Sequence, residues 1–243
     1  MALHFLLETA SEAQPGDAVT LGGAEAHHAA AVRRVRVGEQ VTVGDGAGVW
    51  LTGECEAVAP REVVIRVTAR DDVLAATPRL VLVQALAKGD RDELAVQAAA
   101  ELGVDEIVPW QASRSVSRWD AAKAEKGRTR WAGIVREAAK QAHRAWLPDV
   151  SAIATTTQLA ARAQAADVLV LEPTAEERMS IVPLHGDRDI VLVVGPEGGI
   201  APAEIELLAS AGARPVRLGS TVLRTSTAGP AALAVAATRL GRW

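Results

Sequence analysis

Three segments near the end of the chain place small or conformationally special residues directly after an apolar run. Residues 191–208 read VLVVGPEGGIAPAEIELL, residues 217–233 read RLGSTVLRTSTAGPAAL, and residues 168–177 read VLVLEPTAEE. Gly198 and Gly199 can adopt positive φ and leave room for a ligand to lie against bare backbone. We therefore interpret the glycine-rich turn as part of a ligand pocket, with a plain strand-to-helix corner as the alternative.

The two common nucleotide-binding signatures do not fit this turn. A P-loop places Lys and then Ser or Thr directly after its glycines, to reach the phosphates and the magnesium ion. The stretch GPEGGIAP contains neither. A dinucleotide fingerprint has the spacing G-x-G-x-x-G near the first strand of its fold. Gly195, Gly198 and Gly199 are spaced differently and lie late in the chain, so both signatures are excluded.

The elements that must position these segments are the strands of a parallel sheet. From Leu80 onward, the apolar runs RLVLVQAL, DEIVPW, DVLVLEP, DIVLVVGPEGG and ARPVRLGS alternate with helical patterns. Such alternation predicts an α/β fold with a sheet buried on both faces. The ends of its strands then share the carboxyl edge, where ligands of α/β proteins bind. For TSTAG, helix capping by Thr225, Ser226 or Thr227 is the alternative to ligand contact.

The first 70 or so residues have a different pattern. QVTV, VWLTGECEAV and EVVIRVTA are rich in β-branched residues, and GDGAG at 44–48 reads as a hairpin turn between the first two. A short Ala-rich helix, AEAHHAAAVRR, interrupts the strands. We predict a small β-barrel-like domain, followed by the linker RDDVLAATPR.

Composition and charge narrow the class of protein. The net charge is −4, yet residues 112–146 carry nine basic residues against three acidic ones, and RRVR stands at 33–36. Such local basic zones can guide a polyanion to one face, with a solvated helix face as the alternative. The lone Cys55 and the absence of a signal peptide or a membrane-length apolar run predict a soluble, cytoplasmic protein. No His/Cys cluster has metal-ligand spacing, so no metal is expected.

The whole chain resembles one known family. VVGPEGGIAPAEIE followed by LGSTVLRTSTAGPAAL is similar to the C-terminal signature of SPOUT methyltransferases. Four further blocks, in order, resemble the 16S ribosomal RNA uracil-N3 methyltransferase family (RsmE-like). They are HHAAAVRRVRVGE, QALAKGDRDELAVQAAAELGVDEIVP, SRSV and EAAKQAHRAWLP.

The resemblance implies a fold, a cofactor and an assembly. Residues 73–243 would form a knotted SPOUT methyltransferase domain, with a trefoil knot around a mainly parallel sheet. Residues 1–72 would form a PUA-like β-barrel that binds RNA, and the protein would be a homodimer. The implied cofactor is S-adenosyl-L-methionine, held by loops at the three strand ends described above. The residues expected to contact it are Leu171, Glu172, Pro173, Gly195, Pro196, Glu197, Gly198, Gly199, Leu218, Gly219, Val222, Leu223, Thr225 and Ala228.

The implied reaction is methylation of N3 of a specific uridine in 16S ribosomal RNA of the small subunit. Uracil N3 carries a proton, so the reaction needs a base or stabilisation of the anion. Arg224 is the candidate to stabilise the developing negative charge, and Glu197 is a second catalytic candidate, as the base. Many members of the family read LRTETA where this chain reads LRTSTA, so Ser226 replaces a glutamate and the base stays unassigned.

The implied partner is 16S ribosomal RNA within the small ribosomal subunit. Its phosphates are expected to meet basic residues of both predicted domains. These are Arg33, Arg34, Arg36, Lys88, Arg91, Arg114, Lys140 and Arg144. Two alternatives remain: a 2′-O-ribose RNA methyltransferase, and a non-catalytic RNA-binding or ribosome-assembly factor, which the Ser226 departure keeps open.

Overall fold

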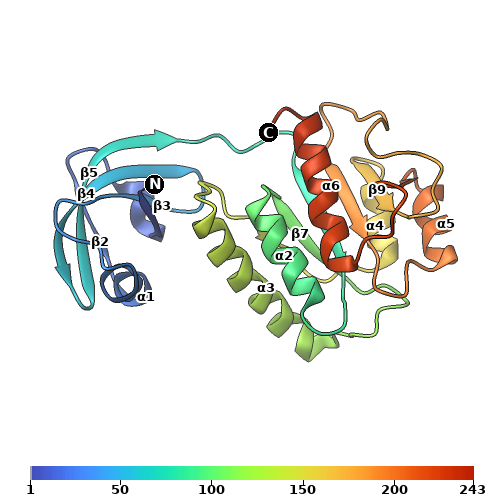
Figure 1. The fold of residues 1–243 in the computed structure, drawn as a ribbon, viewed down its shortest axis with the longest axis horizontal. Coiled ribbons are helices and arrows are strands. Elements are labelled where there is room, and N and C mark those ends of the chain that lie inside the picture. Colours follow the sequence, from blue (N-terminus) through green and yellow to red (C-terminus); the bar gives the residue numbers. More distant parts are fainter. Residues whose placement is uncertain (1) are drawn as a thin grey trace. The chain divides into compact units, whose positions relative to one another are not determined.

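The computed structural model describes residues 2–243 and contains two compact units. One comprises residues up to Ala75 together with Ala139–Leu147, and the other comprises Ala76–Ala138 and Pro148–Trp243. We call them the N-terminal unit and the C-terminal unit (Figure 1). The sequence placed a division at residue 72 and did not assign the segment 139–147 to the first unit.

The N-terminal unit is built on a five-stranded sheet in the order β1-β3-β4-β5-β2. β1 pairs with β3 in parallel, and the other neighbours are antiparallel. The strands are β1 (Leu3–Leu6), β2 (Ala18–Leu21), β3 (Gln40–Gly44), β4 (Val49–Ala59) and β5 (Glu62–Asp72). Short helices connect them: η1 (Glu8–Glu12), α1 (Gly23–His27) and the π-helical η2 (His28–Arg33). The small β-domain predicted from the sequence is present.

Strand periodicity and turn chemistry explain this sheet. On β5, Val63, Ile65 and Val67 are buried and lie on one face, as alternate residues of a strand do. Between β3 and β4, the Asp45 carboxylate accepts hydrogen bonds from the N–H groups of Ala47 (2.7 Å) and Val49 (3.0 Å). The hairpin turn predicted at GDGAG is confirmed.

The segment 139–147 packs inside the N-terminal unit. The Lys140 ammonium lies 3.0 Å from a Glu25 carboxylate oxygen, and the Trp146 indole donates to the Val73 carbonyl at 2.8 Å. Helix α3 (Ala121–Gln141) ends within this segment. His143 has φ +54°, a left-handed conformation that cannot continue a helix.

The C-terminal unit is an α/β structure on a six-stranded parallel sheet, in the order β11-β9-β10-β6-β7-β8. The strands are β6 (Leu80–Ala85), β7 (Glu106–Trp110), β8 (Asp149–Val150), β9 (Asp167–Leu171), β10 (Ile190–Val194) and β11 (Arg214–Val216). Besides α3, the helices are α2 (Arg91–Glu101), α4 (Thr156–Arg162), α5 (Pro202–Ser210) and α6 (Thr225–Arg239). The predicted parallel α/β sheet is confirmed. The two-residue strand β8 was not predicted, because it is too short to leave an apolar run.

Both faces of this sheet are covered by helices. Leu80 and Leu82 belong to the core that includes residues of α2 and α6, which lie together in Figure 1. Val81 and Val83 point to the other face, into the core that includes residues of α4 and α5. This alternation explains why β6 is apolar at nearly every position. Among residues 2–243, no helix is long and apolar enough to cross a membrane.

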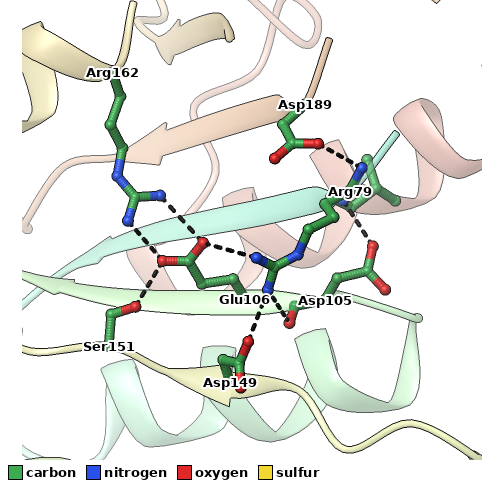
Figure 2. A network of polar contacts seen from close by, with 8 residues as sticks. Arg79, Asp105, Glu106, Asp149, Ser151, Arg162 and Asp189 are labelled. Carbon is green, nitrogen blue, oxygen red and sulfur yellow. Dashed lines mark hydrogen bonds and ion pairs between the residues drawn. The ribbon is translucent and has the colours of Figure 1, made fainter. Parts of the chain in front are cut away.

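A network of charged side chains ties the amino ends of the strands together (Figure 2). Just before β6, Arg79 donates its backbone N–H to Asp189 and its guanidinium to Asp149, both at 2.9 Å. Glu106, the first residue of β7, accepts two hydrogen bonds from Arg162 at 2.6 and 3.2 Å. Burial acts to raise the pKa of Glu106, but its hydrogen bonds, chiefly from Arg162, outweigh burial and lower the pKa. These interactions connect the strands at the amino edge of the sheet.

Candidate functional site

A pocket lies at the carboxyl ends of the neighbouring strands β9, β10 and β11. It encloses about 690 Å³ of empty space, including the part open to solvent. Its lining includes every residue that the sequence proposed for cofactor contact except Gly198. The lining residues that the sequence missed are Val194, Ile200, Val216, Arg217 and Thr221. Four of them are adjacent in sequence to a predicted residue, and Val216 lies two positions before Leu218, so strand-end position was the available signal.

The loop after β10 depends on its glycines. A Cβ atom on Gly195 would lie 2.6 Å from the Ile200 side chain and 3.2 Å from the Ile200 nitrogen. Gly199 has φ +71°, and its N–H donates to the Pro196 carbonyl at 2.9 Å. At Gly198 a Cβ would find its nearest neighbour, Arg114, at an ordinary 3.6 Å. Gly195 and Gly199 are therefore needed by the turn itself, and the bare backbone they leave faces the pocket.

A buried hydrogen-bond chain joins this loop to the middle of the sheet. The Thr225 hydroxyl donates to the Gly195 carbonyl at 2.8 Å and accepts from the Gln84 amide at 3.0 Å. Gln84, on β6, is fully buried, and Thr225 is 6% exposed. The N-cap of α6 is Arg224, which makes no side-chain cap, so Thr225 fastens the pocket loop instead of capping the helix. Sequence reasoning missed Gln84, although a lone amide inside the apolar run RLVLVQAL was a usable signal.

The two catalytic candidates differ in what their side chains already bind. Arg224 is exposed at the rim, between the lining residues Leu223 and Thr225, and its guanidinium makes no hydrogen bond or ion pair within residues 2–243. Glu197 accepts hydrogen bonds from the Lys88 N–H and the Arg91 guanidinium, both at 2.9 Å. Burial acts to raise the pKa of Glu197, but these bonds and one from its own N–H lower it. A carboxylate so occupied organises the loop and is a poor proton acceptor.

A second carboxylate, at the start of the helix that follows the glycine-rich turn, is held by several hydrogen bonds. Glu204, on α5, is 9% exposed and accepts hydrogen bonds from the Ser113 N–H (3.0 Å) and hydroxyl (2.8 Å). The Thr156 hydroxyl adds a third at 2.8 Å. Burial acts to raise the pKa of Glu204, and these hydrogen bonds outweigh it and lower the pKa. Glu204 was not among the residues that the sequence proposed for the site.

The basic residues proposed for RNA contact fall into different settings. In the N-terminal unit, Arg33, Arg34 and Arg36 are exposed. Lys140 is only 3% exposed and is paired with Glu25, so its ammonium is not available to a phosphate in this structure. This result corrects the expectation for Lys140, because an alternating run of basic residues does not show which side chain points inward.

The remaining basic candidates have partners or partial cover. In the C-terminal unit, Lys88 and Arg91 stand beside Glu197. The Arg114 guanidinium donates to the Gly198 carbonyl at 3.1 Å and so holds the pocket loop. Arg144, in the N-terminal unit, is half-buried. Across residues 2–243, no group of three or more His, Cys, Asp or Glu side chains is placed to hold a metal ion.

Comparison with known proteins identifies related chains over the whole length. A family model described as an RNA methyltransferase domain matches residues 75–237, and an RNA methyltransferase PUA domain matches residues 21–68. The chain is 42% identical to the "Ribosomal RNA small subunit methyltransferase E" of Mycobacterium bovis, covering 100% of this chain and 94% of that protein. It is 31% identical to the protein of the same name from Bacillus subtilis, covering 94% and 93%.

A solved structure has the same fold. The Neisseria gonorrhoeae "Ribosomal RNA small subunit methyltransferase E bound to S-adenosyl methionine" superposes with a TM-score of 0.86 at 29% identity. The match covers 98% of each chain. The likeness therefore includes both units.

Proposed function

Because this chain belongs to the ribosomal RNA small subunit methyltransferase E family of RNA methyltransferases, we propose that it methylates N3 of a specific uridine in 16S ribosomal RNA with S-adenosylmethionine. The observation that carries this proposal is the pocket at the ends of β9, β10 and β11, which is lined by the residues predicted for the cofactor.

The pocket fits S-adenosylmethionine in chemistry. Its walls are apolar side chains such as Leu171 and Leu223, and Gly195 and Gly199 present main-chain groups without side chains. This combination suits a flat heteroaromatic ring and a short charged chain. When bound, S-adenosylmethionine supplies an electrophilic methyl group on its sulfonium. The loops at 171–173, 195–199 and 218–228 would hold the cofactor and fix its orientation toward the nucleophile, and orientation of this kind can account for much of a rate enhancement.

Arg224 is the residue we assign to the uracil ring. Loss of the N3 proton leaves negative charge on the ring, and a guanidinium at the pocket rim stabilises such an anion. Its exposure and its lack of a protein partner within residues 2–243 leave it free to meet the substrate. Glu197 is the second catalytic candidate, but its pKa is lowered and both Lys88 and Arg91 already bind it, so we assign it to loop organisation. The base stays unassigned, because Ser226 stands where the family pattern has glutamate.

The proposal includes a two-domain, dimeric enzyme. Residues 1–72 form the PUA-like RNA-binding domain and residues 73–243 the methyltransferase domain, with the trefoil knot and the homodimer that the family resemblance implies. Arg33, Arg34 and Arg36 contact ribosomal RNA phosphates from the first domain, and Lys88 and Arg91 do so from the second. Their exposure supports these roles.

The test is a methyl-transfer assay on small ribosomal subunits that lack their uracil-N3 methyl group. Wild type is compared with Arg224→Ala, Arg224→Lys and the control Arg128→Ala, whose side chain is paired with Glu125 on α3. We expect Arg224→Ala to lower kcat about a hundredfold or more at unchanged affinity for S-adenosylmethionine, and Arg224→Lys to restore part of it. Arg128→Ala should behave as wild type. A wild-type protein that is folded and binds the cofactor but transfers no methyl group would contradict the proposal.

A further inference from the structure

A second cavity in the C-terminal unit lies between the start of α2 and the first turns of α3. It encloses about 920 Å³ of empty space, including the part open to solvent. The two helices stand near each other in Figure 1, and the Arg130–Glu93 ion pair joins them at 2.6 Å. We call this cavity the α2–α3 cleft. The lining residues that carry the argument are Gly89, Arg118, Trp119, Lys123, Lys126 and Arg130.

Positive charge in the cleft is only partly compensated. Its lining holds four basic side chains and two carboxylates. The Glu93 carboxylate forms an ion pair with Arg130, and the Asp92 carboxylate accepts a hydrogen bond from the Ala87 N–H at 3.0 Å. Lys126 makes no ion pair or hydrogen bond with any residue of 2–243, and Arg118 has only a long contact of 3.5 Å to the Ser113 carbonyl. Two cations are therefore available to an anion.

The walls of the cleft add to this preference. Gly89 precedes the first turn of α2, and the N-cap of this eleven-residue helix, Asp90, makes no side-chain cap. The N–H groups at the start of a helix favour negative charge, and here the Asp92 carboxylate already accepts from the Glu93 N–H at 2.9 Å. The floor is aromatic: Trp119 is half-buried and packs edge-to-face on the buried Trp131, with 5.2 Å between ring centroids and an interplanar angle of 69°. A Cβ on Gly127 would lie 2.4 Å from the Trp119 ring, so glycine is what lets the indole lie against α3.

One loop separates the cleft from the cofactor pocket. Ala87 and Gly89 line the cleft, whereas the N–H of Lys88, between them, donates to the Glu197 carboxylate at 2.9 Å. Glu197 in turn lines the cofactor pocket. A chain of phosphates lying in the cleft would thus pass directly beside the place where the target nucleotide meets the cofactor.

We propose that the α2–α3 cleft binds the phosphodiester backbone of the RNA strand next to the target uridine, with Arg118 and Lys126 as the phosphate contacts. This assignment rests on the proposed function and names part of its substrate-binding surface. Uncompensated cations over an apolar aromatic floor suit single-stranded RNA better than a protein partner, because phosphates supply the charge along the whole strand.

Binding to small ribosomal subunits at several salt concentrations tests the assignment. The variant Arg118→Gln/Lys126→Gln removes both cations, and Arg128→Gln is the matched control on the same helix. Each lost phosphate contact lowers the slope of log Kd against log salt by about 0.7, so the double variant should lower it by about 1.4. Its Kd at about 0.1 M salt should rise on the order of tenfold, while its affinity for S-adenosylmethionine stays unchanged.

The outcomes separate this inference from the proposed function. A double variant that binds like Arg128→Gln would overturn the cleft assignment while leaving methyl transfer by the wild type untouched. Loss of cofactor binding in the double variant would show that these side chains support the cofactor pocket instead. That result would also overturn the cleft assignment. A wild type that neither binds nor methylates small subunits would refute the proposed function first.

Cross-linking identifies what occupies the cleft. Cys55 is buried, so Lys123→Cys introduces an exposed thiol for a photoactivated cross-linker and leaves Arg118 and Lys126 in place. We expect the label on 16S ribosomal RNA. A label found only on a ribosomal protein or on a second copy of this chain would contradict the assignment to RNA.

Discussion

Replacing Thr225 with valine removes one hydroxyl from the buried chain between Gln84 and the Gly195 carbonyl, and keeps the shape of the side chain. The Gln84 amide then loses its 3.0 Å acceptor and keeps only the Ala85 carbonyl at 3.1 Å, and the Gly195 carbonyl loses its 2.8 Å donor. A buried polar group left without a partner costs about 1–3 kcal/mol. Because Gln84 is fully buried and Gly195 borders the pocket, we expect the free energy of unfolding to fall by about 2 kcal/mol.

Two measurements follow this change. For a chain of this size, about 2 kcal/mol corresponds to a Tm roughly 4–8 °C lower. Calorimetric titration with S-adenosylmethionine should show a raised Kd, because the Gly195 turn is no longer fastened to α6. Each 1.4 kcal/mol of this loss that reaches the pocket raises the Kd about tenfold.

Gln84→Leu is the matched control for Thr225→Val. Gln84→Leu removes the amide that donates to Thr225, together with an amide oxygen that has no partner within residues 2–243. It leaves the hydrogen bond between Thr225 and the Gly195 carbonyl in place. We expect a loss below about 1 kcal/mol and an unchanged Kd, because an apolar replacement leaves no unpaired amide. Equal effects of the two substitutions on Tm and Kd would refute the view that Thr225 holds the pocket loop.

Further predictions concern the glycine turn and two titratable groups. Gly195→Ala should abolish cofactor binding measured by calorimetry, because its Cβ would lie 2.6 Å from Ile200, whereas Gly198→Ala should bind within a few-fold of wild type; equal effects would contradict this. Burial, then nearby positive charge, lowers the pKa of His4 from 6.5 to about 4, so the folded state resists protonation. The N-terminal unit should therefore lose about 2 kcal/mol of unfolding free energy between pH 6.5 and pH 5, and urea unfolding of His4→Phe should lack this loss. The lowered pKa of Glu204 means that its stabilisation is present above its unfolded pKa and is lost as pH falls through its folded pKa. Glu204→Gln should thus destabilise at pH 7 and converge with wild type in acid; a constant difference would argue against the mechanism.

Much of the pocket could be predicted because its signals are local. A strand buried on both faces leaves a continuous apolar run, and a glycine turn after it marks the carboxyl edge of a parallel sheet. The run that became β10 has this form, and the segments that contain β9 and β11 are followed by Pro173 and Gly219, so the sequence predicted that the three loops share one edge of the sheet. The role of Gln84 could not be predicted, because its partner Thr225 is 141 positions away and no local pattern relates the two residues.

Long-range packing also explains the other differences. The basic run at 112–146 does not show that the Lys140 side chain points inward to Glu25, which lies 115 positions earlier in the chain. The order of charged residues along a helix does not tell which of them face solvent. The basic run also does not predict the hydrogen bond from Trp146 to the Val73 carbonyl. Residues at the end of the run therefore belong to the N-terminal unit, which the sequence did not indicate. Both facts depend on contacts between distant parts of the chain, which periodicity does not report.

Nucleoside mass spectrometry of 16S ribosomal RNA tests the central claim most directly. Small subunits lacking the uracil-N3 methyl group are incubated with the wild-type protein and S-adenosylmethionine, and the RNA is then digested to nucleosides. The account predicts one new modified nucleoside, 3-methyluridine, formed about a hundredfold or more slowly with Arg224→Ala. A 2′-O-methylated nucleoside in its place, or no new nucleoside from a folded protein that binds the cofactor, would contradict it.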